Sequence, residues 1–436
     1  MDTSGGCPSR GGPAQSSDVF PLKMSRRPLI AFLAGLAPYP PPLIGSSLRI
    51  ARLLRELHRE FDIALLCLAD VDTATIVDNW ELGKELTRIV AVPRPKPLGK
   101  RDAIWGSILT CVKATVVTSL PNQRPRMFDW GWSDELVDAT RRTLNELDID
   151  AVWATRSWSG EMARAAGANR IIVDVDDFQG DLMVRELAQL RPYKRKALHL
   201  IQAKNLLKYE RRLLRRYSAI AICKQEDSAL VEPDSPQRIH VVPNGVDFPS
   251  GVDRSRVSPA ELLFVGTLSW SPNMEAMRQL VEHILPTIQE TFAEASLTVA
   301  GRSPTPEEVR SLLSRPNVQL RESPVSLTEY YSRASIGVAP LLRGGGTSIK
   351  VLESLAYALP TVVTPVAARG LGLEDGKHLL IASSNRDFAA ACVHLLKNPA
   401  KARALGEAGR EEVLRRFSWQ SAGASARAAI HAVLES

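Results

Sequence analysis

Short apolar runs alternate with stretches of helical spacing along most of this chain. The run Leu29–Gly35 ends in a Pro/Gly loop, Pro38–Gly45, after which Ser46–Arg59 has the spacing of a helix. The same order recurs with helical stretches such as Asp134–Leu147 between the runs. Further strand candidates in the first half are Phe61–Leu68, Ala151–Thr155, Arg170–Asp174, Ala219–Cys223 and Ile239–Val242. This alternation predicts an α/β fold, with a parallel sheet covered by helices on both faces.

A second series of such runs follows the polar stretch Phe248 to Pro259. Its strand candidates are Glu261–Gly266, Ser296–Gly301, Val318–Leu320, Ile336–Pro340, Thr361–Thr364 and His378–Ile381. Because 436 residues are too many for one ordinary core, two doubly wound, Rossmann-like domains are expected. Ligands of such sheets bind beyond the carboxyl ends of the strands, so we expect a cleft between the two domains.

Domain boundaries follow from this pattern and from composition. The Gly/Ser/Pro-rich residues 1–24 lack the apolar core of a secretory signal, which predicts a disordered tail. We expect a first domain over 25–247, a linker over 248–259 and a second domain over 260–415. A C-terminal helix over 416–436 is expected to pack back toward the first domain.

Composition limits the location and the partners that we expect for the protein. Five scattered cysteines, an odd number without a CxxC pair, indicate free thiols and a cytoplasmic location. The most apolar stretch, Ala103–Leu120, carries Lys113 in its middle, so we expect no transmembrane segment. A net charge of +7 favours anionic partners such as phosphates, acidic lipid or nucleic acid. Nucleic acid ranks last, because the basic stretches lack a recognition motif or interleaved aromatics.

A glycine-rich turn opens onto a helix in the second half. Gly344, Gly345, Gly346, Thr347 and Ser348 follow a predicted strand and precede apolar residues at helical spacing. Backbone N–H groups and the positive end of a helix dipole suit a diphosphate. In the first turn of this helix, a cation is unfavourable unless an anion is near, so Lys350 is interpreted as a phosphate partner. Glu353, one turn on, can bridge ribose hydroxyls, with a surface or capping role as the alternative.

Gly344–Pro360 resembles the signature of the family-4 retaining glycosyltransferases, which have the GT-B fold of two facing Rossmann-like domains. It is most similar to a subgroup that reads Gly-Gly-Gly-Thr-x-x-Lys and lacks the first of two paired glutamates. Glu353 matches the second glutamate, which holds the nucleotide ribose in that family. The first glutamate, which contacts the donor sugar there, falls on Gly345. The resemblance therefore implies that the backbone of Gly346–Ser348 or the side chain of Thr347 takes part in sugar recognition.

Other segments extend the resemblance over most of the chain. Phe264–Asn273, with Gly266, Thr267 and Asn273, resembles the first strand and loop of the subgroup's donor domain, and Pro243–Asp247 resembles the segment that leads into it. Val299–Arg302 resembles the second strand end of that domain. The Arg and Lys phosphate clamp of the wider family is absent after Gly266, and Arg302 and Lys350 are expected to replace it. For Arg302, a solvated loop charge is the alternative.

Two further matches fall in the first domain. Tyr39–Ser47 resembles the loop that faces the donor diphosphate, which makes Gly45 and Ser46 donor-binding candidates, although a plain strand–helix connection has the same composition. Val173–Asp177 resembles a strand end where this subgroup has acids. Asp176 and Asp177 are therefore catalytic candidates that orient hydroxyls or act as a general base. A divalent cation site or a cap for the next helix are the alternatives.

The resemblance implies transfer of a hexosyl or related group from a nucleotide-diphosphate sugar to a glycan or lipid-linked acceptor. Surface polysaccharide, glycolipid or cell-envelope glycan synthesis is the expected setting, with no metal and no other cofactor. The leaving diphosphate is expected to accept the acceptor's proton on the same face, while Lys350 and Arg302 stabilise its charge. A nucleotide-sugar epimerase of the same fold and a non-catalytic nucleotide-sugar-binding protein are the alternatives.

The stretch Val184 to Arg216 holds eleven Lys and Arg residues but only two acids, Glu186 and Glu210. Leucines and an isoleucine recur within it at roughly helical spacing, so it predicts a basic amphipathic segment. Such a segment can rest on anionic lipid at the inner face of the plasma membrane. A solvated basic face is the alternative. Ala103–Leu120 either adds an apolar surface nearby or forms a core helix.

Overall fold

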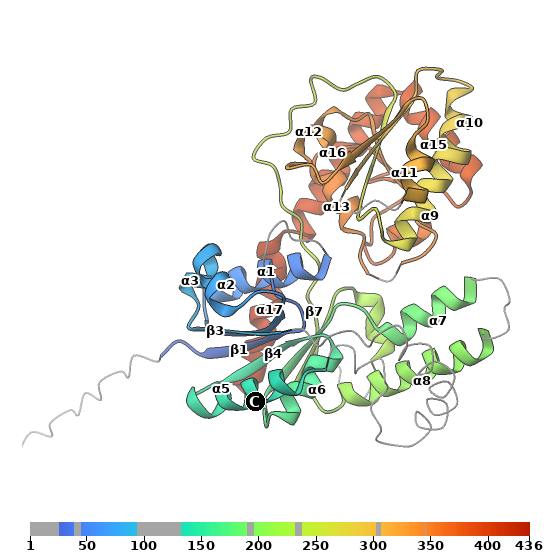
Figure 1. The fold of residues 1–436 in the computed structure, drawn as a ribbon. Coiled ribbons are helices and arrows are strands. Elements are labelled where there is room, and N and C mark those ends of the chain that lie inside the picture. The colour runs from blue at the N-terminus through green and yellow to red at the C-terminus, as the bar shows by residue number, and fades with distance from the viewer. Residues whose placement is uncertain are drawn as a thin grey trace, which may run out of the picture.

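The protein folds into two lobes, each built on a parallel sheet (Figure 1). The computed structural model describes residues 26–38, 45–93, 132–189, 196–231, 238–301, 307–344 and 346–436. Every strand predicted from the apolar runs is present, with ends shifted by at most two residues. The predicted α/β architecture of two doubly wound sheets is confirmed.

The sheet of the first lobe has seven strands in the order β3-β2-β1-β4-β5-β6-β7. Their bounds are β1 Leu29–Ala34, β2 Asp62–Ala69, β3 Arg88–Pro93, β4 Ala151–Thr155, β5 Ile171–Val175, β6 Ala219–Ile222 and β7 Ile239–Val241. The strands pair in parallel, for example Leu29 opposite Asp62. All residues of β1, β4 and β5 are buried, which explains their continuous apolar character. The edge strand β3 was not predicted, although it carries a short apolar run, Ile89–Val92; several of its residues are half-exposed, as befits an edge strand.

Helices cover both faces of this sheet. One face packs against α1 (Gly45–His58), α2 (Thr73–Asn79), α3 (Glu81–Glu85) and the C-terminal helix α17 (Trp419–Leu434). The other face packs against α5 (Asp134–Glu146), α6 (Ser157–Ala165) and α8 (Lys196–Leu214). Helix α7 (Gln179–Gln189) packs along α8, and both extend from the body of the lobe (Figure 1). A short 3-10 helix, Gln225–Leu230, follows β6.

The second lobe has a six-stranded parallel sheet in the order β10-β9-β8-β11-β12-β13. Its strands are β8 Glu261–Val265, β9 Ser296–Gly301, β10 Val318–Glu322, β11 Ile336–Ala339, β12 Thr361–Val363 and β13 Leu380–Ile381. Its helices are α9 Ser271–Gln279, α10 Leu285–Gln289, α11 Glu307–Leu313, α12 Thr328–Arg333, α13 Ile349–Ala356, α14 Pro365–Ala368, α15 Asn385–Lys397 and α16 Pro399–Arg416. A π-helical turn, Leu280–Ile284, joins α9 to α10.

The chain passes between the lobes twice, and the two crossings lie side by side. The outgoing crossing follows β7, and the returning crossing leads from α16 into α17. The Val246 amide donates to the Phe417 carbonyl oxygen at 2.8 Å. A Cβ atom at Gly245 would lie 2.5 Å from the Trp419 ring, so only glycine fits there. Helix α17 then packs along α1 of the first lobe. Among the described residues, no helix is both long and apolar enough to cross a bilayer.

Candidate active site

The glycine-rich turn lies between the buried strand β11 and the first turn of α13, on the side that faces the first lobe. Ser348 occupies the N-cap position in an extended conformation, but its side chain does not cap the helix. The Ser348 hydroxyl is buried and has no hydrogen-bond partner within the described residues. Because the side chain leaves the first N–H groups of α13 uncapped, this helix end is suited to an anion.

An acid from the first lobe closes over this turn. A Cβ atom at Gly346 would lie 3.1 Å from Oδ2 of Asp177, which is tighter than an ordinary contact. Glycine at this position therefore lets the two lobes approach. Gly344 precedes the turn at the exit from β11, whereas Gly345 lies outside the described residues.

Lys350 reaches from α13 to the end of β8, where it lies half-buried against the ring of Phe264. Its Nζ is 4.2 Å from the centroid of that ring and donates to Oδ1 of Asn273 at 2.6 Å. The Asn273 amide is fixed in turn, because its Nδ2 donates to the Thr267 carbonyl oxygen at 2.9 Å. Burial lowers the pKa of Lys350 to about 7, although nearby Glu353 opposes this.

Four of the predicted donor-binding residues therefore meet at one point, the carboxyl end of β8. Three of them, Thr267, Asn273 and Lys350, are joined by hydrogen bonds. Gly266 lets both side chains approach the backbone, because a Cβ atom there would lie 2.5 Å from Nδ2 of Asn273 and 3.0 Å from Nζ of Lys350, and these side chains would have to shift. Arg302, the other predicted cation, lies outside the described residues.

A cavity of about 180 Å³ opens between the lobes beside α13. Both lobes and the crossing segments contribute its wall, which is made of Leu48, Gly245, Val246, Asp247, Leu327, Thr328, Tyr331, Ile349, Glu353, Tyr357 and Trp419. Glu353 accepts a hydrogen bond from the Tyr331 hydroxyl at 2.8 Å. Burial raises the pKa of Glu353, while the Tyr331 bond and Lys350 oppose the rise. Glu353 thus faces a cleft of a size suited to part of a small ligand.

Asp176 and Asp177 follow β5 and differ in protonation. Oδ1 of Asp176 accepts from the Cys223 thiol at 3.0 Å and from Nδ2 of Asn244 at 3.4 Å. Although burial opposes it, the Arg49 cation and these hydrogen bonds hold the pKa of Asp176 below its usual value. Burial and the neighbouring Asp176 charge raise the pKa of Asp177 to about 7. The pair therefore combines an ionised acid with one that exchanges a proton near neutral pH.

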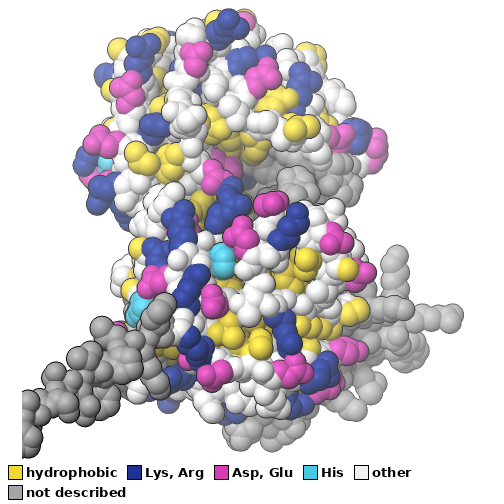
Figure 2. Space-filling model, turned by 90° about the vertical axis from the view of Figure 1, so that its left-hand side faces the viewer, with side chains coloured by type: hydrophobic (Ala, Val, Ile, Leu, Met, Phe, Trp, Pro, Cys, Tyr) yellow, Lys and Arg dark blue, Asp and Glu magenta, His cyan; other side chains and the backbone are white. Residues whose placement is uncertain are grey.

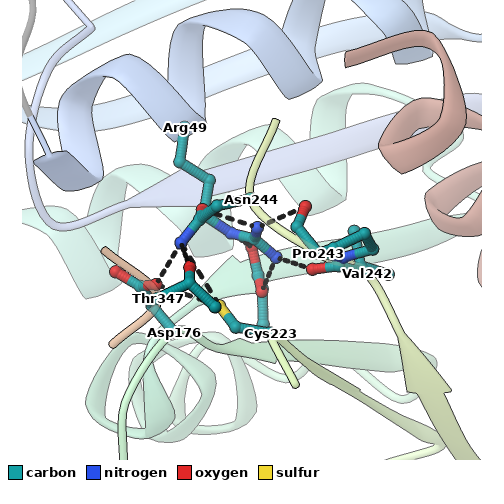
Figure 3. A network of polar contacts seen from close by, with 8 residues as sticks. Arg49, Asp176, Cys223, Val242, Pro243, Asn244 and Thr347 are labelled. Carbon is teal, nitrogen blue, oxygen red and sulfur yellow. Dashed lines mark hydrogen bonds and ion pairs between the residues drawn. The ribbon is translucent and has the colours of Figure 1, made fainter. Parts of the chain in front are cut away.

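A buried cation, Arg49 of α1, organises these acids and the crossing segment (Figure 3). Its guanidinium donates to both carboxylate oxygens of Asp174, at 3.0 and 2.8 Å. It also donates to the Val242 carbonyl oxygen at 2.8 Å and to Oδ1 of Asn244 at 3.0 Å. Nδ2 of Asn244 then donates across the cleft to Oγ1 of Thr347 at 2.8 Å. Thr347, a predicted donor-binding residue, is thereby joined to the predicted catalytic acids.

Sequence reasoning missed Arg49, Asn244, Tyr331 and Lys224. Lys224 is 1% exposed, and its Nζ lies 3.7 Å from Oδ1 of Asp177 and 3.4 Å from Asp227. One available signal was the acid Asp174 inside the apolar run of β5, because a buried carboxylate needs a cationic partner. Gly45 and Ser46 form the start of α1, and most of the loop that precedes them, residues 39–44, lies outside the described residues.

Comparisons with known proteins agree with this geometry. Residues 259–398 match the model of the family described as glycosyl transferases group 1. This match lies within the second lobe. Sucrose-phosphate synthase from Thermosynechococcus elongatus aligns with a TM-score of 0.66 and 15% identity, covering 92% of this chain and 98% of that chain. Anabaena HepE in complex with UDP and glucose aligns with a TM-score of 0.63 and 10% identity, covering 92% and 99%. The chain has the GT-B fold.

Curated relatives share parts of the sequence. An alpha-maltose-1-phosphate synthase of Mycobacterium tuberculosis is 25% identical over 327 residues, 66% of this chain and 82% of that protein. A glycogen synthase of the same organism is 28% identical over 197 residues, 42% of this chain and 46% of that protein. An uncharacterized 44.6 kDa protein in the cps region of Klebsiella pneumoniae is 25% identical over 160 residues, 35% and 41% of the two chains. The chain thus spans less than half the length of the last two relatives.

Proposed function

We propose that this protein is a retaining glycosyltransferase that uses a nucleotide-diphosphate sugar. The observation that carries the proposal is the cleft beside α13, where a half-buried lysine, an uncapped helix end and a half-buried glutamate converge from one domain. The resemblance to the family-4 subgroup and the group 1 domain over residues 259–398 support it. Complexes of HepE with UDP-glucose, one of the similar structures, support a nucleotide sugar as donor.

The proposed position of the donor follows from the charge and shape of the cleft. The nucleoside would occupy the cavity, with the free lone pairs of Glu353 accepting from the ribose hydroxyls. The diphosphate would lie against the N–H groups of α13 and beside Lys350, whose amine would gain a second anionic neighbour besides Glu353. The sugar would then point toward Gly346, Thr347 and the first-lobe acids. No metal is needed in this arrangement.

The chemical step exchanges one bond for another at the anomeric carbon. The bond from this carbon to the diphosphate oxygen breaks, and the acceptor oxygen bonds to the same face of the sugar. The acceptor's proton passes to the leaving phosphate oxygen, while Lys350 and the α13 N-terminus stabilise the developing charge. Asp177 lies against Gly346 and orients a hydroxyl of donor or acceptor, while Asp176 stays ionised beside it.

The acceptor is proposed to be a glycan or lipid-linked molecule of the cell envelope, presented at an anionic membrane surface. The Klebsiella relative in a cps region supports a surface polysaccharide setting. Helix α8 supports the membrane contact, because it carries exposed Lys204 and Lys208 next to Ile201, which is 46% exposed. On the face shown in Figure 2, Lys, Arg, Asp and Glu side chains intermingle over both lobes.

The experiment is a thermal-shift screen of nucleotide sugars, followed by turnover with the best binder and a panel of acceptors. We expect release of the nucleoside diphosphate and a product that NMR shows to keep the donor's anomeric configuration. With Asp177→Asn, kcat is expected to fall by about 100-fold with little change in donor affinity. Inversion at another sugar carbon without transfer would identify an epimerase. Binding without any turnover would identify a non-catalytic binding protein.

A further inference from the structure

Tyr331 of α12 is held rigidly under the cavity. Its ring is 2% exposed and packs in a small apolar cluster beneath the sheet with Leu263, Val265, Ala300, Ala334 and Leu359. It also stacks on Tyr357 of the α13 end, with ring centroids 4.9 Å apart and planes 16° from parallel. The Tyr357 hydroxyl is engaged with Oγ1 of Thr328 at 2.9 Å, which fixes the stack at both ends.

The hydroxyl of Tyr331 has one partner among the described residues, Oε2 of Glu353 at 2.8 Å. Burial and the Glu353 charge keep the pKa of Tyr331 well above its ordinary value. The hydroxyl therefore keeps its proton over the physiological range and donates to the carboxylate. A glutamate has three side-chain torsions, so one fixed donor on one oxygen removes much of its freedom and leaves the other oxygen for the cavity.

The groups that affect the ionisation of Glu353 come from three elements. Tyr331 of α12 and Lys350 of α13 favour the ionised carboxylate, whereas burial and Asp247 of the crossing segment oppose it. Because burial lowers the pKa of Lys350 to about 7, its amine is only partly charged near neutral pH in the free protein. The Tyr331 hydroxyl is therefore a main stabiliser of the carboxylate before any ligand binds.

We propose that Tyr331 is a positioning residue that sets the selectivity of this site for ribose, by holding Glu353 ionised and aimed at the cavity. The proposal rests on the function proposed above, in which Glu353 accepts from the two ribose hydroxyls. It goes beyond that function because the selectivity between ribose and deoxyribose is assigned to the Tyr331 hydroxyl, whose hydrogen bond goes to Glu353.

The test measures binding, by calorimetry on the full chain, of the nucleoside diphosphate that wild type binds best among ADP, GDP and UDP. Its 2′-deoxy and 3′-deoxy analogues are measured beside it. Wild type is expected to prefer the ribose form by about tenfold or more, as charge-assisted hydrogen bonds allow. Tyr331→Phe keeps the ring and is expected to lose most of this preference, with affinity for the deoxy analogues nearly unchanged. Tyr330→Phe, on the same helix but outside the cavity wall, should behave as wild type.

Further measurements separate positioning from packing. In a Glu353→Gln background, Tyr331→Phe should change the preference no further, because the acceptor that it positions is gone. Wild-type affinity should weaken as pH falls through the pKa of Glu353, and Tyr331→Phe should move this loss to higher pH. An equal loss for ribose and deoxy forms, or an unchanged preference, would overturn the proposal. Failure of wild type to bind any nucleoside diphosphate would instead refute the proposed function.

Discussion

Lys350 has an unusual environment for a lysine. Its amine is buried between the Phe264 ring and one amide oxygen, that of Asn273. Burial favours the uncharged form of the amine. An anion bound nearby would favour the charged form, so the amine would then take up a proton. A diphosphate at the α13 N-terminus would supply that anion and raise the pKa of the lysine again. Binding of an anionic ligand is therefore expected to be coupled to protonation of the Lys350 amine.

The expected outcome is proton uptake on donor binding. At about pH 8, above the lowered pKa, the free amine is mostly neutral, and a diphosphate would return it to the charged state. Calorimetry in buffers of different ionisation enthalpy should show uptake that shrinks toward lower pH. Lys350→Met should abolish the uptake and weaken nucleoside diphosphate binding by about ten- to hundredfold. Lys377→Met, at an exposed lysine paired with Glu374, is the control. Uptake that persists in Lys350→Met would contradict the assignment.

At the scale of single residues, the sequence predicts those site residues that lie close together in the chain. The glycine turn, Lys350 and Glu353 lie within one strand–turn–helix unit, so their arrangement follows from a few residues. Arg49 and Asp174 are 125 positions apart, and Tyr331 lies 22 positions before Glu353. Such pairs depend on strand order and on how helices pack on each sheet, which a local pattern does not contain.

At the scale of elements, continuous apolar runs predicted the central strands, because a parallel sheet is buried on both faces. The basic segment predicted from residues 184–216 forms parts of two helices, α7 and α8, packed closely together. A Cβ atom at Gly180 would lie 2.2 Å from the Leu207 amide nitrogen, so glycine permits this contact. Glu210, counted only as one of two acids, accepts from the Gln179 and Gly180 amides at the start of α7, at 3.2 and 2.9 Å. Helices α7 and α8, here called the α7–α8 hairpin, are therefore held rigidly together.

Contact of this hairpin with a membrane has a direct test. Wild type is expected to sediment with vesicles of anionic phosphatidylglycerol and not with neutral phosphatidylcholine, and high salt should release it. Ile201→Glu should weaken this binding about tenfold or more, since it removes an exposed apolar side chain that would enter the bilayer surface and adds a repelled charge. Leu414→Glu, at a 48% exposed site on α16 of the other lobe, is the matched control. Equal binding by wild type and Ile201→Glu would rule out α8 as the contact.

At the scale of the molecule, the two lobes touch through the residues that form the site. Besides the Asn244–Thr347 hydrogen bond and the contact of Asp177 with Gly346, Lys224 of the first lobe packs on Gly370 of the second. A Cβ atom at Gly370 would lie 2.6 Å from Cδ of Lys224. Because Lys224 also faces Asp177, closure of the lobes and the setting of the acids depend on the same side chains. The relative position of the two lobes is therefore linked to the position of the acids in the site.

The Asn244–Thr347 bond is expected to stabilise the closed arrangement. Arg49 holds Oδ1 of Asn244, so Nδ2 must point toward Thr347. Asn244→Ala and Thr347→Val should each shift the equilibrium toward open lobes by about two- to tenfold, the value of one hydrogen bond. Small-angle scattering should show a larger radius of gyration, and kcat should fall more than affinity for nucleoside diphosphate. The double variant should be no worse than Asn244→Ala alone, because Asn244→Ala already removes the contact that Thr347→Val removes. Thr298→Val, which removes a buried hydroxyl bonded to Glu261 within the second lobe, should leave the scattering unchanged. Additive effects of the two substitutions would show that they act on separate contacts.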